Sequence, residues 1–262
     1  MKISIRPRRP GSDPDPTELA ATHTPAAIQA RLASPPSASY LRDFIYGAID
    51  GTVTTFAIVA GVEGAALSAA IVIILGLANL CGDGFSMAAS NFLASRAQVE
   101  ERRRAWDRER RQIGRYPEGE REEIRQIFAA KGFSGPELDR AVEVITADED
   151  LWIETMMTEE LGYAREETDP LRAAAATFIA FVLVGFIPIA AFVWDAVTPF
   201  ELDEAFLWSA LMTAIAFLAV GIAKSRIVGQ SSWRGGIETL AVGGVAATLA
   251  YIVGNLLSSL AS

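Results

Sequence analysis

Residues 42–91 decide the fold and read RDFIYGAIDGTVTTFAIVAGVEGAALSAAIVIILGLANLCGDGFSMAASN. They form two apolar spans joined by a turn near Glu63. Each span is near the length of about 20 residues that a helix needs to cross a bilayer. Asp50 lies inside the first span, with Tyr46 and Thr54 one helical turn away on either side. A carboxylate at membrane depth costs about 3 kcal/mol or more, so we expect it to face a cavity or a partner helix.

The second span carries a stripe of polar residues. Asn79, Asp83, Met87 and Asn91 recur every four residues, which places them on one face of a helix. Together with Asp50 they have the composition of a cation path. Two alternatives stay open, because Asp83 could lie at the membrane surface and Met87 could be an ordinary packing residue.

The composition excludes several classes of function. Hydrophobic residues make up 51% of the 262 and charged residues 21%, which predicts separate apolar and charged blocks. The single cysteine, Cys81, excludes an intramolecular disulfide and a cysteine-based metal site. The single histidine, His23, lies in a polar N-terminal segment, so neither a His-rich metal site nor a Ser-His-Asp triad fits the body of the chain. We expect no enzymatic activity, no tightly bound cofactor and no nucleic-acid partner.

The distribution of Lys and Arg predicts the topology. All 23 basic residues fall in segments 1–42, 96–172 and 224–236. The positive-inside rule then places these segments and the N-terminus in the cytoplasm and the C-terminus outside. We therefore predict an all-α membrane protein with five transmembrane helices near residues 44–62, 65–93, 173–194, 205–223 and 239–257. Because the sequence shows no organelle signal and is compact, we expect a bacterial plasma membrane.

The chain divides into four predicted regions. They are a disordered cytoplasmic tail (1–40) with a short helix near 24–33, helices 1 and 2 (41–95), a cytoplasmic helical metal-binding domain (96–170) and helices 3 to 5 (171–262). Pro188 predicts a kink in the third helix. The glycines of the fifth span, such as Gly243, Gly244 and Gly254, indicate close helix packing.

The region 96–170 has the pattern of a small helical bundle. Its first part continues the second membrane helix until Gly114 and Pro117 break it. An amphipathic helix then runs to Gly132, and Ser134 is a candidate N-cap for the next helical stretch. That last stretch is either one helix or two, broken near residues 146–150.

Oxygen and thioether groups recur at helical spacing in this bundle. Carboxylates suit Fe²⁺ and Mn²⁺, and a thioether favours softer or borderline ions. The alternative is that the glutamates form a solvated helix face and the methionines belong to the core. The pairs in question are Glu109 with Gln112, Glu120 with Glu123, and Met156 and Met157 with Glu160.

Four stretches together resemble the vacuolar iron transporter family. They are RDFIYGAIDGTVTTFAIVAG and GDGFSMAASNFLASRA in the membrane region, and YPEGEREEI and WIETMMTEELGY in the bundle. The resemblance covers residues 43–262. It implies a five-span homodimer that moves Fe²⁺, sometimes Mn²⁺, out of the cytosol in exchange for protons, with the path at the dimer interface between the first helices.

The resemblance also implies roles for individual residues. Asp50 and Met87 match the metal-contacting positions of the path, to which we add Asp43 and Asp83. Two positions depart from the family pattern: Gln112 and Asn79 stand where glutamates are found in other members, so each site has one negative charge fewer. The predicted cytoplasmic metal site consists of Glu109, Gln112, Glu120, Glu123, Met156, Met157 and Glu160.

The sequence thus favours a dimeric metal-ion/proton antiporter embedded in membrane lipid. The rival hypothesis is a membrane-anchored metal sensor or storage-docking protein, in which the bundle is the functional part and the spans are an anchor. The polar stripe and Asp50 argue against that rival, because a plain anchor has no use for a carboxylate inside a span.

Overall fold

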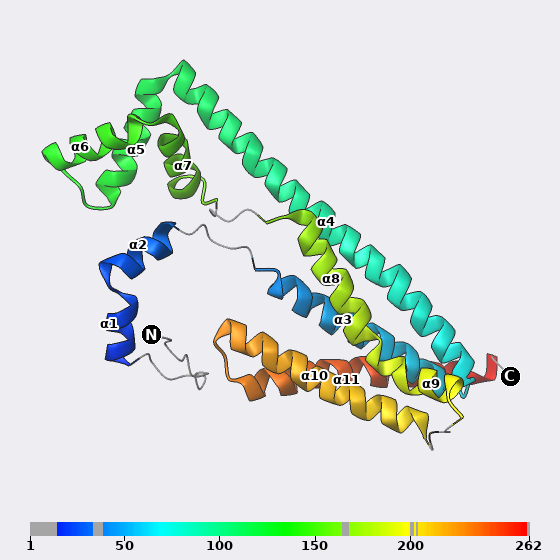
Figure 1. Cartoon of the computed structure of the whole chain (residues 1–262). Helices are drawn as coiled ribbons and strands as arrows, with labels where there is room; N and C mark the ends of the chain where they lie inside the picture. Colours follow the sequence, from blue (N-terminus) through cyan, green and yellow to red (C-terminus); the bar gives the residue numbers. More distant parts are fainter. Residues whose placement is uncertain (1–14, 34–38, 164–167, 200–201, 203, 261–262) are drawn as a thin grey trace. The chain divides into compact units, whose positions relative to one another are not determined.

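The structure is a computed structural model that describes residues 15–33, 39–163, 168–199, 202 and 204–260. The described residues form helices and contain no strand, which confirms the predicted all-α class (Figure 1). They divide into two compact units. The span unit takes in the described parts of residues 1–35, 39–92 and 171–262, and the bundle unit the described parts of residues 93–170.

The span unit contains helices suited to a bilayer. Four single helices are long and apolar enough to cross it, and a bent pair, α8 (Pro170–Gly185) with α9 (Ile187–Val197), supplies a fifth candidate. The chain is therefore an integral membrane protein with four or five candidate spans. The four single helices are α3 (Leu41–Gly64), α4 (Ala69–Arg115), α10 (Ala205–Val228) and α11 (Ser232–Leu257), the last continued by a 3₁₀ turn at Ser258–Leu260.

The kink predicted at Pro188 is confirmed. The chain turns by 53° between α8 and α9. Pro188 lies in the first turn of α9, where a missing backbone N–H is tolerated because no carbonyl precedes it in that helix. The Ser209 hydroxyl on α10 donates a hydrogen bond to the Pro188 carbonyl oxygen, which ties α10 to the start of α9 just after the bend.

Helix α3 packs against its neighbours by backbone contact. A Cβ on Gly51 would lie 2.5 Å from the carbonyl oxygen of Phe181 on α8, so the two backbones touch there. A Cβ on Gly254 of α11 would overlap the carbonyl oxygen of Gly61. Small residues allow such approach between membrane helices. Gly244 differs, because a Cβ there would meet no described atom within 4 Å.

An apolar core lies between these helices. Valines of α3 and α4 pack with aromatic and branched residues of α8 and α9, all of them nearly inaccessible to solvent. Burial of this kind holds α3 in the middle of the unit through dispersion contacts and close packing. The core residues are Val59, Val62, Val72, Leu80, Phe181, Ile189 and Phe192.

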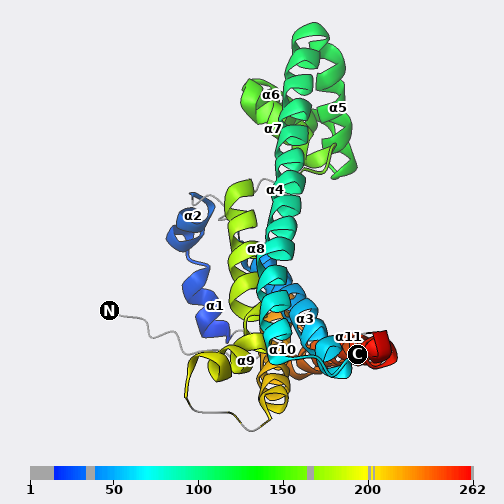
Figure 2. The same ribbon diagram turned by 90° about the vertical axis from the view of Figure 1, so that its right-hand side faces the viewer.

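The bundle unit begins within α4, which runs unbroken from the apolar into the charged sequence (Figure 1). The predicted break at Pro117 is confirmed, because α5 (Pro117–Ala130) starts there. Gly132 then adopts a φ of +99°, which ends α5 and favours glycine. Helices α6 (Gly135–Thr146) and α7 (Glu149–Glu159) complete the bundle beside α4 and α5 (Figure 2).

Two details of the bundle answer questions that the sequence left open. The last predicted stretch forms two helices, separated where Asp148 accepts hydrogen bonds from the backbone N–H groups of Asp150 and Leu151. Ser134 occupies the N-cap position of α6, but its side chain makes no capping hydrogen bond.

The described part of the tail holds two short helices. Helix α2 (Pro25–Ala33) confirms the helix predicted near residues 24–33. Helix α1 (Pro16–Thr22) was not predicted; Asp15 caps it by accepting a hydrogen bond from the Thr17 N–H at 3.2 Å.

The contact between α3 and α11 leads to a first prediction. We expect Gly254→Ala to force the two helices apart and to lower the free energy of unfolding by about 1–3 kcal/mol. Gly244→Ala, on the same helix, is the matched control, and it should be neutral or slightly stabilising because alanine favours the helix. Thermal unfolding of the purified protein measures both. Equal melting temperatures for the two variants would contradict the packing described here.

Candidate functional site

Polar side chains of α3 and α4 pair along the facing sides of these helices. Near the N-terminus of α3, the Asn91 side-chain amide donates a hydrogen bond to Asp43 Oδ1 at 3.0 Å. About three helical turns further along α3, the Asn79 amide donates to Thr54 Oγ1 at 3.1 Å. The helices are thus antiparallel and in register. We call the set Asp43, Asp50, Thr54, Asn79, Asp83 and Asn91 the polar track.

The middle of the polar track is occupied by two carboxylates. Asp50 on α3 and Asp83 on α4 are each half-buried and close enough to interact through their charges. The Thr54 hydroxyl donates a hydrogen bond to the backbone carbonyl oxygen of Asp50 at 3.0 Å, so this bond does not involve the Asp50 carboxylate. Two negative charges in an apolar setting repel each other, and a divalent cation or a proton would relieve that repulsion.

Met87 lies on the same face of α4, one turn from Asp83 and one turn from Asn91. It is half-buried and packs against the apolar core of the span unit. This placement brings the thioether to the level of the track between Asp43 and Asp50. It also agrees with the alternative in which Met87 is a packing residue.

Helix α8 contributes a residue that sequence reasoning missed. Asn91 also donates to Thr177 Oγ1 at 2.8 Å, so one amide joins α3, α4 and α8. The Thr177 hydroxyl in turn donates to the Ala173 carbonyl oxygen at 3.0 Å. The sequence marked Thr177 only as a hydroxyl residue within an apolar span. This pattern is too common to identify Thr177 as a site residue.

In the bundle unit, ion pairs fix the ends of α7. Arg110 of α4 lies 3.2 Å from Glu149 at the start of α7. Lys131, just after α5, lies 2.6 Å from Glu159 at the end of α7. These pairs are solvent-exposed and each is worth only about 0–1 kcal/mol, so their effect is mainly to orient α7 against α4 and α5. Glu160 occupies the C-cap position of α7, directly after Glu159.

Four glutamates of the predicted metal site interact electrostatically, and we call Glu109, Glu120, Glu123 and Glu160 the carboxylate cluster. Burial, followed by repulsion from the other three carboxylates, raises the pKa of Glu120 to about 7. Burial and then Glu160 and Glu123 raise the pKa of Glu109, while Arg108 opposes the change. For Glu160 the pKa is raised by burial and then by Glu123.

Glu109 and Glu120 are enclosed by the bundle although they carry carboxyl groups. They are only 4% and 5% exposed, and Glu120 Oε2 has no hydrogen-bond partner among the described residues. Glu120 lies in the first turn of α5, where the helix dipole favours negative charge. A buried, unpaired carboxylate oxygen is costly, so this atom is open to a proton or a cation.

The other predicted ligands lie differently. Met156 and Met157 are fully buried in the bundle core with Ile124, Ile153 and Trp152, as the core alternative expected. Gln112 is solvent-exposed. Within the described residues, no three Asp, Glu, His or Cys side chains converge closely enough to hold a metal ion. The four glutamates are therefore close enough to raise one another's pKa values but are not a preformed metal centre.

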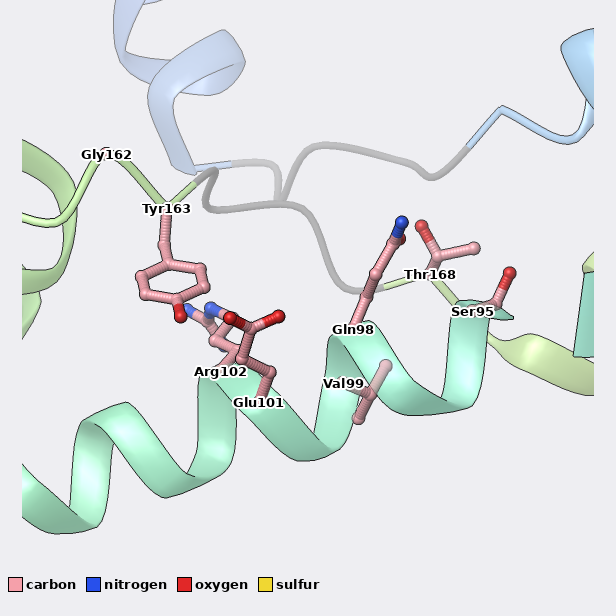
Figure 3. Close-up of a pocket in the computed structure, with 8 residues that line it drawn as sticks. All are labelled: Ser95, Gln98, Val99, Glu101, Arg102, Gly162, Tyr163 and Thr168. Atoms are coloured by element: carbon pink, nitrogen blue, oxygen red, sulfur yellow. The ribbon is translucent and has the colours of Figure 1, made fainter. Parts of the chain in front are cut away.

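The bundle unit also contains a pocket of about 230 Å³ that uses none of these residues. Figure 3 shows Tyr163, which follows α7, pointing its hydroxyl toward Arg102 and Glu101 of α4. Both charges are present in its lining, so the pocket has no clear preference for an anion or a cation. Its lining residues are Ser95, Gln98, Val99, Glu101, Arg102, Gly162, Tyr163 and Thr168.

The fold, the polar track and the carboxylate cluster define the class of protein. It is a helical integral membrane protein with acidic side chains inside its spans and a separate acidic bundle. Comparison with known proteins gives the family. The model of the VIT family matches residues 41–255. The chain belongs to this family, which confirms the resemblance seen in the sequence.

Named relatives agree with this assignment. The chain is 34% identical over 227 residues to the vacuolar iron transporter of Toxoplasma gondii, covering 84% of this chain and 75% of the relative. It is 32% identical over 219 residues to vacuolar iron transporter 1 of Arabidopsis thaliana, covering 82% and 85%. Membership in a family of transporters agrees with the expectation that the chain is not an enzyme.

The raised pKa of Glu120 leads to a second prediction. The folded state holds this proton more tightly than the unfolded chain, whose pKa is near 4.5, so the free energy of unfolding should fall as pH rises from about 4.5 to about 7. Glu120→Gln removes that loss. We expect it to stabilise the bundle at pH 8, by about 1–3 kcal/mol, and to have little effect at pH 5.

Thermal unfolding at the two pH values measures the difference. Glu118→Gln is the matched control, because Glu118 lies on the same helix but is exposed. The assignment would be wrong if both variants changed the melting temperature equally, or if Glu120→Gln acted equally at both pH values.

Proposed function

We propose that this chain is a divalent metal-ion transporter that carries Fe²⁺, or Mn²⁺, from the cytoplasm across the membrane in exchange for protons. The observation that carries the proposal is the pair Asp50 and Asp83, two carboxylates that interact within the apolar parts of α3 and α4. Such groups are expensive in a bilayer and usually mark an ion pathway. The family membership and the names of the relatives support iron as the cargo.

Exchange follows from competition at one carboxylate. A protonated carboxyl is a poor metal ligand, so Asp50 binds either the ion or a proton. Binding of the ion on the cytoplasmic side expels the proton, and protonation on the other side releases the ion. Asp83 shares the charge, Asp43 with Asn91 forms the entrance, and the Met87 thioether favours Fe²⁺ over Mg²⁺ or Ca²⁺.

In this proposal the bundle unit collects the ion before transport. Carboxylates whose pKa values are raised toward neutrality exchange protons for metal within the cellular pH range. A bound ion would draw the carboxylate cluster together, because it cancels the repulsion that now separates these groups. Gln112 and the sulfur atoms of Met156 and Met157 would act only if the bundle rearranged.

The assembly and orientation are also part of the proposal. The one-sided distribution of Lys and Arg supports a cytoplasmic N-terminus and bundle, with the C-terminus outside. We propose a homodimer in a bacterial plasma membrane, with the path at the interface between the two α3 helices. The half-buried carboxylates of α3 support this arrangement, since a second copy would shield them from lipid.

The rival function, a membrane-anchored metal sensor or storage-docking protein, is favoured by one specific observation. The carboxylate cluster, with a pKa near 7 at Glu120, could report metal or pH without any transport. The polar track does not fit this rival, because a signalling anchor gains nothing from paired carboxylates inside its spans.

A third prediction tests transport. In proteoliposomes with an imposed pH gradient, Asp50→Asn should reduce Fe²⁺ flux by at least about tenfold, because it keeps the shape but removes the charge and the proton site. Thr248→Ala, an exposed position on α11, is the matched control and should transport like the parent. If the Asp50→Asn chain carries gradient-driven Fe²⁺ at the parent rate, Asp50 is not the exchange site. If the parent protein carries no Fe²⁺, the result would favour the membrane-anchored metal sensor or storage-docking protein.

A fourth prediction tests the carboxylate cluster. We expect Glu120→Ala with Glu123→Ala to weaken Fe²⁺ or Mn²⁺ binding by the full-length protein, measured by titration calorimetry, by at least about tenfold. The matched control is Glu118→Ala with Glu122→Ala, which removes the same charge from exposed positions of α5. Gln112→Glu should tighten binding if residue 112 turns toward the ion. Equal binding by the two double variants would mean that the cluster is only a helix face.

A further inference from the structure

We propose that a groove between α9 and α10 binds one acyl chain of a membrane phospholipid, and that its acidic rim favours a headgroup with an ammonium group. The groove belongs to the span unit, and none of its described lining residues is part of the polar track. This site does not depend on transport, so a protein that moves no Fe²⁺ would leave the proposal standing.

The groove is a hollow of about 320 Å³ between two neighbouring helices. Two small residues of α9, Ala190 and Ala191, leave the space, and larger apolar side chains surround them. The opposite side of α9 packs Ile189 and Phe192 into the core of the span unit, so the groove lies on the side turned away from that core. The lining residues are Ala190, Ala191, Trp194, Leu202, Trp208 and Met212.

The positions of the lining residues along the helices indicate how deep the groove runs. Trp194 lies in the last turn of α9 and Trp208 in the first turn of α10, and both are half-exposed. Tryptophans at the ends of spans favour the boundary between headgroups and hydrocarbon. Met212 lies one turn beyond Trp208, about 10 Å from the start of α10. The groove therefore extends from the headgroup level into the hydrocarbon, as an acyl chain does.

The chemistry of the lining suits an acyl chain better than an ion. None of the described lining residues carries a charge, so the groove offers nothing to a hydrated cation. Inside a bilayer the hydrophobic effect does not favour protein over lipid, and close packing decides what fills a hollow. An empty hollow loses dispersion contacts along its walls, and a chain lying on the two alanines restores them.

The rim of the groove is acidic. The Leu202 N–H donates a hydrogen bond to Asp195 Oδ1 at 2.9 Å, which fixes one wall and places a carboxylate beside it. Residues 195–204 contain four acidic side chains and neither Lys nor Arg. An ammonium group is attracted to such a rim and an anionic headgroup is repelled. We therefore expect phosphatidylethanolamine to bind better than phosphatidylglycerol.

The same rim disfavours a second copy of the chain as the occupant. A symmetric contact through this groove would bring the acidic rims of the two copies together at the same membrane level. Like charges at that distance repel each other, whereas a lipid ammonium group relieves the excess of negative charge.

The experiment uses the full-length purified protein and two readouts. Native mass spectrometry counts the lipid retained from an equimolar mixture of phosphatidylethanolamine and phosphatidylglycerol, and thermal unfolding measures the stabilisation by each lipid. Ala190→Phe fills the groove, and Ala241→Phe, at an exposed position of α11, is its matched control. Asp195→Asn with Glu204→Gln removes charge from the rim but keeps an oxygen for the Leu202 N–H. Its control is Glu63→Gln, in the exposed turn after α3.

We expect the parent to retain phosphatidylethanolamine about threefold better than phosphatidylglycerol, the effect of one exposed ion pair. Ala190→Phe should lower that retention by about tenfold and abolish the rise in melting temperature, because the ring takes the place of the chain. The rim variant should keep one lipid but lose the preference, while both controls behave like the parent.

Two results would overturn the lipid site. One is equal lipid retention by Ala190→Phe and Ala241→Phe. The other is a preference that the rim variant leaves unchanged, and this result decides the matter even if Ala190→Phe does not fold. A loss of dimer in Ala190→Phe, with no lipid retained by the parent, would assign the groove to a second copy of the chain instead.

Discussion

The hydrogen bond between a polar side chain and a partner on another helix is the interaction on which the span unit depends. Inside a bilayer there is no water to satisfy such a group, so each one must find a partner in the protein. Asn79 and Asn91 do this from α4, and they fix its register against α3 at two levels. The glycines of α3 then let α8 and α11 pack backbone to backbone against α3. The position of Asp50 follows from this arrangement and not from its own bonds.

The bundle unit has charged side chains both at its surface and in its interior. Its exposed ion pairs join helices at the surface, where water makes them weak, while Glu109 and Glu120 are enclosed beside an apolar core. Among the described residues, no basic side chain offsets burial and repulsion enough to prevent the rise in the pKa of Glu109 and Glu120. The bundle therefore folds with a local excess of negative charge, and only a proton or a cation can remove it.

Much of the fold could be predicted from the sequence because its signals are local. Apolar runs predicted the spans, and Pro117, Gly132 and Pro188 marked breaks that the structure confirms. The partners of the polar residues could not be predicted, because Thr55 and Thr177 meet α4 only through tertiary packing. By their spacing, Glu109 and Gln112 were equally good candidate ligands, but Glu109 is buried and Gln112 is exposed. A shared helix face is about 100° wide or more, and only the neighbouring helices decide which edge of it is covered.

The two sites differ in how they would hand over an ion. In the bundle, a pKa near 7 at Glu120 means that a small change in pH or metal concentration shifts the group between proton and cation. In the polar track, the facing carboxylates are flanked by amides and hydroxyls that carry no charge and do not titrate near neutral pH. Protonation of Asp50 or Asp83 would change the charge of the track without removing a partner from the hydrogen bonds that Asn79 and Asn91 make to α3. In the proposed exchange this separation matters, because protonation that releases the ion would leave the contacts between α3 and α4 in place.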